Sequence, residues 1–278
     1  MSVSGLDQAD LRGVRVLVTG ATSGIGRAMA EALVGAGAAV AITGRDLARA
    51  EEVAAGMADG PGRAVGLSMD VRDEDQVARG VAEVLDRLDG LDVLVNNAGL
   101  GMRSVNPRFL TDPRPFWEVS QRAFADLIAT NLTGYFLVAR AAVPHLLRAG
   151  RGRIVNVTMN HSTMRRRGFV PYGPSRAGTE SLSRIMEADL AGTGISVNML
   201  LPGGPTATGM IPEELTAEVR RLLLPATVMA APIVWLCSAA AEGVTGERIV
   251  AAEFDGWLEE RERRSGAATA GPAGSEGG

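Results

Sequence analysis

Residues 14–26 read VRVLVTGATSGIG, and this stretch decides the fold class. Its first six residues are mostly apolar and rich in valine, a pattern typical of a strand that is buried on both faces. The glycine-rich turn that follows leads into a helical stretch at residues 24–34. A strand, a glycine turn and a helix in this order predict the first unit of a parallel sheet whose strands are joined by helices.

The alternation of strand and helix continues along the chain. Further strands are predicted at 39–43, 64–69, 92–96, 153–158, 195–200 and 248–252. Helical stretches are predicted at 47–57, 74–88, 121–148, from 172 onward and at 228–238. Right-handed crossovers arrange such units into an α/β fold: a single Rossmann-like doubly wound parallel sheet of about seven strands with helices on both faces.

Composition bounds the domain organisation and the partners. Residues 1–264 are expected to form one domain, and residues 265–278 (SGAATAGPAGSEGG) a disordered low-complexity tail with too little apolar surface to fold. A net charge of −4 argues against a nucleic-acid partner, and the single Cys237 excludes a multi-cysteine metal site. No apolar run reaches the roughly 18 residues that cross a membrane, and the first residues lack an apolar signal segment. We therefore expect a cytoplasmic protein with neither a metal nor a membrane partner.

The turn at residues 19–26 has the properties of a pyrophosphate site. Doubly wound sheets bind ligands at the carboxyl ends of their strands. Glycines let the backbone approach a phosphate closely, and a helix N-terminus supplies free N–H donors and the positive end of the helix dipole. We expect the cofactor-binding residues of this turn to be Gly20, Thr22, Ser23, Gly24, Ile25 and Gly26.

The residues after the second strand indicate which nucleotide binds. An acidic side chain at this place holds the ribose hydroxyls of NAD, but the sequence reads Thr43-Gly44-Arg45-Asp46. A guanidinium group suits a 2′-phosphate, so NADP(H) is favoured over NAD(H), with Arg45 as the selecting residue. Asp46 is interpreted as the N-cap of the next helix.

Several further motifs follow in order. They are Asp70-Val71, Asn96-Asn97-Ala98-Gly99, Asn131 in TNLTGYF, Tyr172 four residues before Arg176, and Pro202-Gly203. Together with the glycine turn, they make residues 13–252 resemble the short-chain dehydrogenase/reductase family. The resemblance implies hydride transfer between NAD(P)H and a carbonyl or secondary alcohol on a small-molecule substrate, and assembly as a homodimer or homotetramer. It also implies cofactor contacts at Asp70, Val71, Asn97, Ala98, Gly99, Tyr172, Arg176, Pro202 and Gly203.

The resemblance further implies a catalytic group of tyrosine, lysine, serine and asparagine. Tyr172 would transfer the proton and Asn131 would support a water relay. Arg176 stands in place of the lysine, in a chain whose 28 basic residues other than histidine are all arginine. A guanidinium one helical turn from Tyr172 can still favour a phenolate and bind ribose hydroxyls, but it cannot relay a proton.

The serine position is occupied by Met159, which lies three residues after Asn156 and thirteen before Tyr172. A thioether cannot donate a hydrogen bond to an oxyanion, and losing one such donor typically costs about 10²–10³ in rate. Thr158, Asn160 and Ser162 are alternative donors, with Asn160 and Ser162 ranked equally, or no residue takes the role. Two functions therefore stay open: an NADP(H)-dependent oxidoreductase, or a redox-impaired protein that acts as a cyclase, a dehydratase or a cofactor-gated binding module.

Other candidates receive plainer interpretations. His161 is expected to be a solvated loop residue, and Tyr135 a core residue. The run Arg165-Arg166-Arg167 is either a solvated face or a selector of anionic substrates. Residues 101–122 are longer than this connection usually is in the family and are expected to shape either the substrate pocket or an interface. Residues 203–215 are predicted to cover the substrate.

Overall fold

Strand β1 (Arg15–Val18) lies in the interior of a parallel sheet. Within residues 9–212 and 216–269, which this computed structural model describes, seven strands pair in the order β3-β2-β1-β4-β5-β6-β7. The remaining strands are β2 (Ala39–Gly44), β3 (Arg63–Ser68), β4 (Val93–Asn96), β5 (Gly152–Val157), β6 (Ile195–Leu201) and β7 (Arg248–Val250). The strand order reverses between β1 and β4, so the predicted doubly wound sheet is confirmed and its switch point lies at the carboxyl ends of these two strands.

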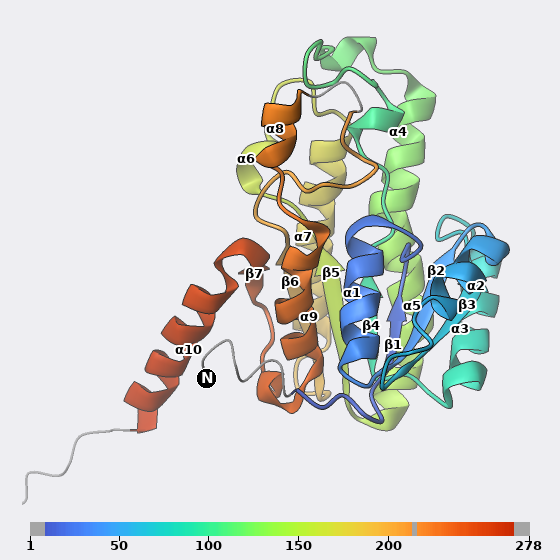
Figure 1. Cartoon of the computed structure of the whole chain (residues 1–278), viewed down its shortest axis with the longest axis vertical. Coiled ribbons are helices and arrows are strands. Elements are labelled where there is room, and N and C mark those ends of the chain that lie inside the picture. Colours follow the sequence, from blue (N-terminus) through green and yellow to red (C-terminus); the bar gives the residue numbers. More distant parts are fainter. Residues whose placement is uncertain (1–8, 213–215, 270–278) are drawn as a thin grey trace, which may run out of the picture.

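Helices cover both faces of the sheet (Figure 1). One face carries α1 (Gly24–Gly35), α2 (Leu47–Ala55) and α9 (Ala230–Cys237). The other carries α3 (Glu74–Leu88), α5 (Gly134–Ala149) and α7 (Tyr172–Asp189). This is the predicted arrangement, because a parallel sheet is joined by helical crossovers that must bury their apolar faces on it.

The first strand shows why the sequence is apolar throughout such elements. Val16 and Val18 pack in the cluster beneath α1 and α9, and Leu17 packs on the opposite face beneath α3 and α5. All three side chains are fully buried, because successive residues of a strand point to opposite faces. Burial of a side chain of this size contributes roughly 1.5–3 kcal/mol, so both layers stabilise the strand.

Register aligns the polar ends of the central strands. Val18 pairs with Val95, and Asn96 pairs with Asn156 across β4 and β5. The Asn96 side chain donates to the Asn156 side-chain oxygen at 2.9 Å, and both residues are fully buried. The carboxyl ends of β1, β4 and β5 therefore meet at one edge, where the predicted site residues lie.

The long helix predicted at 121–148 is interrupted. It consists of α4 (Gln121–Ile128), a π-helical turn (Ala129–Thr133) and α5. By length and composition, the stretch Gln121–Ala149 would suffice to cross a membrane. Here it packs on α3, β4 and β5, and 44% of its most apolar window is buried inside the protein.

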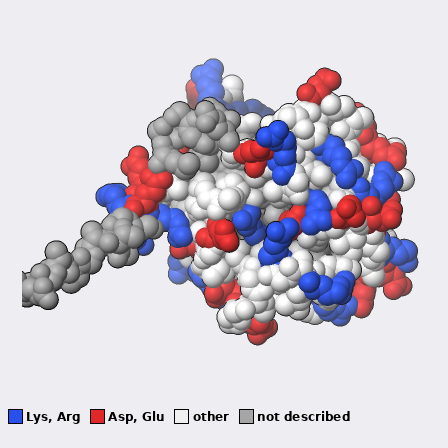
Figure 2. Space-filling view, turned by 90° about the horizontal axis from the view of Figure 1, so that it is seen from below, with Lys and Arg blue, Asp and Glu red and all other residues white. Residues whose placement is uncertain are grey.

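The sequence did not predict the helix α10 (Phe254–Thr269), which extends away from the sheet (Figure 1). Its first turns pack through Phe254 and Trp257 on Trp235 of α9. The helix continues five residues into the stretch assigned above to a disordered tail, and residues 270–278 lie outside the described residues. Seen from below, the molecule carries arginine and acidic side chains that are interspersed over the surface (Figure 2).

Candidate active site

The glycine turn after β1 adopts conformations that need glycine. Gly20 and Gly24 have φ values of 62° and 58°, in the region that favours glycine. A Cβ on Gly26 would lie 2.3 Å from the Asn97 side-chain nitrogen. Ser23 is the N-cap of α1 but makes no capping hydrogen bond, so the first amides of α1 have no side-chain acceptor from this cap. A free helix N-terminus behind a tight glycine turn is able to bind a phosphate group.

The end of β4 braces this turn. Asn97 donates through its side-chain nitrogen to the Thr19 and Gly20 carbonyls at 2.8 and 3.0 Å. The Thr19 hydroxyl accepts from the backbone N–H groups of Asn97 and Ala98. A Cβ on Gly20 would lie 2.6 Å from the Ala98 Cα, so the two segments are in close contact. Asn97 and Ala98 thus lie at the turn, as expected, and Asn97 fixes its shape.

The end of β2 is open to solvent. A Cβ on Gly44 would lie 2.7 Å from the Thr22 methyl group, so a larger side chain does not fit there without rearrangement. Arg45 is exposed and makes no ion pair with the described residues. Asp46 accepts a hydrogen bond from the Arg49 N–H, which confirms it as the N-cap of α2.

The remaining cofactor candidates border the same edge. Asp70 forms a two-pronged ion pair with Arg72, whose hydrogen bonds hold the pKa of that carboxyl below its usual value. Val71 is buried against Gly134 at the start of α5, and Ile25 packs partly buried on the core beneath α1. Pro202 and Gly203 follow β6, where their carbonyls accept from the Ala252 N–H and the Asn160 side chain.

Tyr172 and Arg176 lie beside each other on the first turns of α7. The guanidinium carbon of Arg176 lies 5.5 Å from the centroid of the Tyr172 ring, and the Arg176 side chain is almost fully buried. Its Nη2 occupies space next to Gly99, where a Cβ would lie 2.4 Å away. Burial acts against the charged form, but the neighbouring phenols outweigh this effect and raise the pKa of Arg176 above its ordinary value. The arginine is therefore a fixed cation beside the partly buried Tyr172.

Tyr135 belongs to this group as well, which the sequence did not reveal. The sequence placed Tyr135 in the core, and it is indeed buried, but its hydroxyl oxygen accepts from Arg176 Nη1 at 2.8 Å. The available signal was the spacing: Tyr135 follows Asn131 by four residues, in α5, which continues the π-helical turn that contacts α7.

Asn131 lies in the π-helical turn and is fully buried. Its side chain accepts from the Leu100 N–H at 2.8 Å and donates to the Leu100 carbonyl at 2.9 Å and the Ser175 hydroxyl at 3.1 Å. Its own carbonyl accepts from the Thr179 hydroxyl. The residue ties the segment after β4 to α7, and its role in a water relay stays a prediction.

Met159 lies at the end of β5 in a small apolar cluster. Its side chain is buried with Met102, Phe109 and Phe169, and Tyr172 packs on the same cluster. Of the alternative donors, Asn160 is engaged with the Gly203 carbonyl at 2.7 Å, and Ser162 is exposed on the short helix α6 (His161–Met164). Catalytic roles for Met159, Asn160 and Ser162 stay predictions.

A polar network supports the loop that carries Met159. The Glu180 carboxylate of α7 accepts from the Thr158 hydroxyl at 3.0 Å and from Arg248 Nε at 2.8 Å, and it pairs with His161 at 2.7 Å. Arg248 also donates to the Met159 carbonyl at 2.7 Å. His161 is exposed, as expected, but it is held by this hydrogen bond to Glu180. Of the neighbouring arginines, Arg166 stacks over the Phe169 ring.

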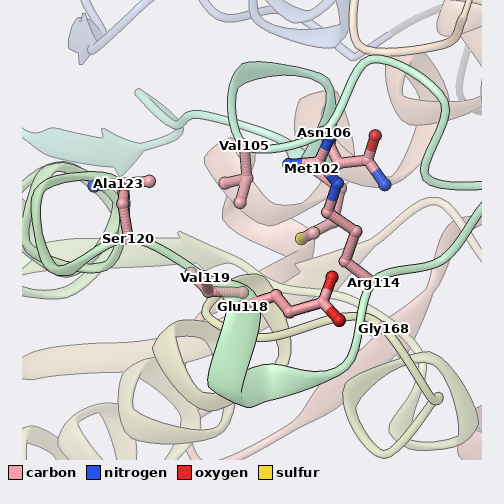
Figure 3. A pocket seen from close by; sticks show the side chains of 9 residues that line it. All are labelled: Met102, Val105, Asn106, Arg114, Glu118, Val119, Ser120, Ala123 and Gly168. Carbon is pink, nitrogen blue, oxygen red and sulfur yellow. Dashed lines mark hydrogen bonds between the residues drawn. The ribbon is translucent and has the colours of Figure 1, made fainter.

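The long segment 101–122 borders a pocket of about 90 Å³ (Figure 3). It is lined by Met102, Val105, Asn106, Arg114, Glu118, Val119, Ser120, Ala123 and Gly168. Gly168 packs against Pro113, so the segment covers the loop before Tyr172.

The loop after β6 reaches the same area. Thr208 lies close to Gly24, Met210 lies close to Gly101, and the Gly209 carbonyl accepts from Arg103. This loop therefore contacts both the glycine turn and the segment 101–122. The short helix α8 (Ala217–Arg221) follows, and residues 213–215 of the predicted covering loop lie outside the described residues.

Comparisons with known proteins agree with this geometry. The family described as short chain dehydrogenase matches residues 14–218. Gluconate 5-dehydrogenase of Gluconobacter oxydans (strain 621H) is 34% identical over 197 residues, which cover 71% of this chain and 73% of that protein. The 3-oxoacyl-acyl-carrier-protein reductase FabG of Aquifex aeolicus (strain VF5) is 32% identical over 248 residues, covering 86% and 96%. A crystal structure of a dehydrogenase/reductase from Sinorhizobium meliloti 1021 matches with a TM-score of 0.77 and 31% identity, covering 89% of this chain and 96% of that one.

Proposed function

The chain belongs to the short-chain dehydrogenase family, and on this premise we propose that it is an NADP(H)-dependent oxidoreductase that interconverts a carbonyl and a secondary alcohol. The observation that carries the proposal is the pairing of Tyr172 with the buried Arg176 cation at the carboxyl edge of the sheet. Contacts link this pair to the glycine turn, because Gly99 lies against Arg176 and the adjacent Ala98 lies against Gly20. A small-molecule substrate would bind between the turn and the apolar cluster around Met159.

The residues fit a nicotinamide nucleotide. The N-terminus of α1 lacks a side-chain cap behind a turn that only glycines allow, which suits a pyrophosphate. The Nε–H of Arg176 is buried without a hydrogen-bond partner among the described residues, which supports a donor role towards ribose. When bound, the nicotinamide would accept or supply the hydride. Tyr172 would give or take the substrate proton, and Arg176 would favour its phenolate form during alcohol oxidation.

The preference for NADP(H) is supported by the end of β2. Gly44 has no room for a carboxylate that would bind ribose hydroxyls, because Thr22 packs against it. The exposed Arg45, which has no ion-pair partner among the described residues, can place its guanidinium on a 2′-phosphate.

A direct assay tests the proposal. Purified protein is incubated with NADPH and a panel of aldehydes, ketones and 3-oxoacyl thioesters, and absorbance at 340 nm is followed. We expect loss of absorbance with at least one substrate and none with the Tyr172→Phe variant. Tight NADPH binding without turnover of any substrate would contradict the oxidoreductase proposal.

A second candidate function is favoured by the surroundings of Met159: a cofactor-binding protein with a non-redox activity, such as a cyclase or dehydratase, or a cofactor-gated binding module. Its side chain lies in an apolar cluster and offers no N–H or O–H to a substrate oxygen. Under this alternative, Met159→Ser would raise a negligible reductase rate by a large factor. Robust turnover by the unmodified protein would remove the alternative.

A further inference from the structure

The Arg176 cation lies between two phenol rings. Its guanidinium carbon is 5.5 Å from the centroids of both the Tyr135 and the Tyr172 rings. These are the only two tyrosines in the chain. The side chain of Arg176 is 3% exposed, so the charge has little water around it and depends on protein groups for its hydrogen bonds.

Two acceptors orient the guanidinium. Nη1 donates to the Tyr135 hydroxyl oxygen at 2.8 Å and to the Val157 carbonyl at 3.0 Å. The Tyr135 hydroxyl in turn donates to the same Val157 carbonyl at 3.2 Å. Tyr135 therefore donates its hydroxyl hydrogen to the Val157 carbonyl of β5, and its oxygen accepts a hydrogen bond from Arg176.

The surroundings of Tyr135 favour the neutral form of its hydroxyl. It is 1% exposed, and burial raises the pKa of its hydroxyl although the nearby Arg176 acts in the opposite direction. A buried phenol that retains its proton is an acceptor for the guanidinium and not an acid or base for a substrate. Its influence on chemistry must pass through Arg176.

We propose that Tyr135 is a positioning residue: its hydroxyl oxygen, with the Val157 carbonyl and the space left by Gly99, holds the Arg176 guanidinium beside Tyr172. This inference rests on the proposed function. A guanidinium is planar and needs acceptors in fixed directions, whereas a lysine ammonium is a compact charge that rotates to find them. Arg176 and Tyr135 thus form a functional pair, in which the arginine needs an acceptor at position 135.

The variant Tyr135→Phe removes one oxygen atom. Without it Nη1 keeps only the Val157 carbonyl, and the cation is held less firmly beside Tyr172. We expect kcat for alcohol oxidation to fall about tenfold with little change in KM, the size expected for a lost hydrogen bond to a charged group. The control Ser183→Ala removes another buried α7 hydroxyl, which bonds to Asn156 instead, and should leave both values unchanged.

A double-mutant cycle tests whether Tyr135 affects the reaction rate through Arg176. In the Arg176→Lys background, Tyr135→Phe should add less than about a twofold loss, because the acceptor no longer has a guanidinium to orient. Equal losses in both backgrounds, or a Tyr135→Phe variant that keeps kcat unchanged, would overturn the inference.

A second double-mutant cycle tests the contact between Tyr135 and Arg176 without relying on the proposed function. Urea unfolding of Tyr135→Phe, Arg176→Met and the double variant needs no substrate. Non-additive free energies of unfolding are expected if the two side chains are paired in solution, and strict additivity would refute the pairing. Absence of turnover together with non-additive unfolding would refute the functional role while retaining the contact.

Discussion

The buried cation at position 176 shows how a single side chain imposes requirements on its neighbours. A guanidinium without water needs both hydrogen-bond acceptors and open space, because a lost acceptor leaves a buried donor unsatisfied and a lost space creates a steric clash. Tyr135 and Val157 supply the acceptors, and Gly99 supplies the space. Each of these residues is therefore as much a part of the site as the residue that carries the charge.

The space beside Gly99 leads to a sharp prediction. Gly99→Ala places a methyl group 2.4 Å from Arg176 Nη2 and 3.2 Å from the Asn131 side-chain oxygen. We expect a loss of about 1–3 kcal/mol in the free energy of unfolding, since the two groups must move. The variant should also lose most of its oxidoreductase activity. Gly35→Ala is the matched control, because a Cβ there meets nothing within 4 Å and should leave stability the same or higher. Urea unfolding measures the stability of both variants. Equal free energies of unfolding would contradict the close contact between Gly99 and Arg176.

Cofactor selection is a second prediction at this scale. Arg45→Glu should weaken NADPH binding by about tenfold or more while NADH binding changes little, because a carboxylate repels a 2′-phosphate and accepts ribose hydroxyls. Cofactor fluorescence titration measures both affinities. Arg49→Glu makes the same change of charge on the next turn of α2, so an equal effect there would assign the result to general electrostatics.

At the scale of elements, α7 is the part that joins the site together. Its first turn carries Tyr172 and Arg176, and its third turn carries Glu180, which binds the end of β5, α6 and β7 at once. The position of the loop with Met159 therefore depends on a carboxylate two turns away from the proposed chemistry.

This dependence predicts a response to acid. Burial would raise the pKa of Glu180, but hydrogen bonds from Arg248 and His161 outweigh it and lower the pKa from its ordinary 4.5. The stabilisation from this carboxylate is thus fully present above pH 4.5 and lost as the pH falls through its lowered folded value. Glu180→Gln should cost about 1–3 kcal/mol at pH 7 and flatten the fall in stability below pH 4.5. Thermal unfolding from pH 3 to 7 measures both the stability at pH 7 and its fall in acid. The control is Glu51→Gln, which changes an exposed carboxylate of α2.

How far the sequence predicts this structure varies between elements for physical reasons. The bounds of α3 follow from the sequence alone, because Asp73 caps a helix with regular amphipathic spacing and Asp89 ends it in the left-handed region. The π-helical turn around Asn131 was missed because the apolar pattern continues through it. Helix α10 was missed because few apolar side chains mark it, and its packing depends on Trp235, far away in the sequence.

The site divides in the same way. The glycine turn, Arg45 and the Tyr172–Arg176 spacing are local patterns that can be found in the sequence alone, and their functional roles stay predictions. The partners that fix them are Tyr135, Gly99 and Glu180, which come from separate elements. Only the topology of the sheet brings them together, so local patterns offered the spacing of Tyr135 from Asn131 and the motif that contains Gly99, but not the contacts of these residues with Arg176 or the network around Glu180.

At the scale of the whole molecule, the outer surface of α4 and α5 carries exposed aromatic side chains. Phe124 and Phe136 are 42% and 41% exposed. Together with the resemblance to the family, this supports the proposal that the protein is a homodimer or homotetramer. Two such groups on one helical stretch are suited to an interface between copies.

The proposal predicts a measurable mass. Light scattering should give two or four times the chain mass of 28.9 kDa. Phe136→Glu should shift the protein towards monomer, because a carboxylate would be buried at the interface. Leu47→Glu, at a similarly exposed position on α2, should leave the mass unchanged. A monomeric parent protein would refute the assembly.

The three tryptophans occupy contrasting surroundings. Trp117 is 73% exposed on the segment 101–122, whereas Trp235 is buried and packs edge-to-face on Trp257 where α10 joins α9. Their emission should therefore separate into a red component from Trp117 and a blue component from the buried Trp235. A single fluorescence spectrum thus reports on both ends of the molecule: quenching of the red band by ligands near the pocket, and a red shift of the blue band when the C-terminal helix detaches.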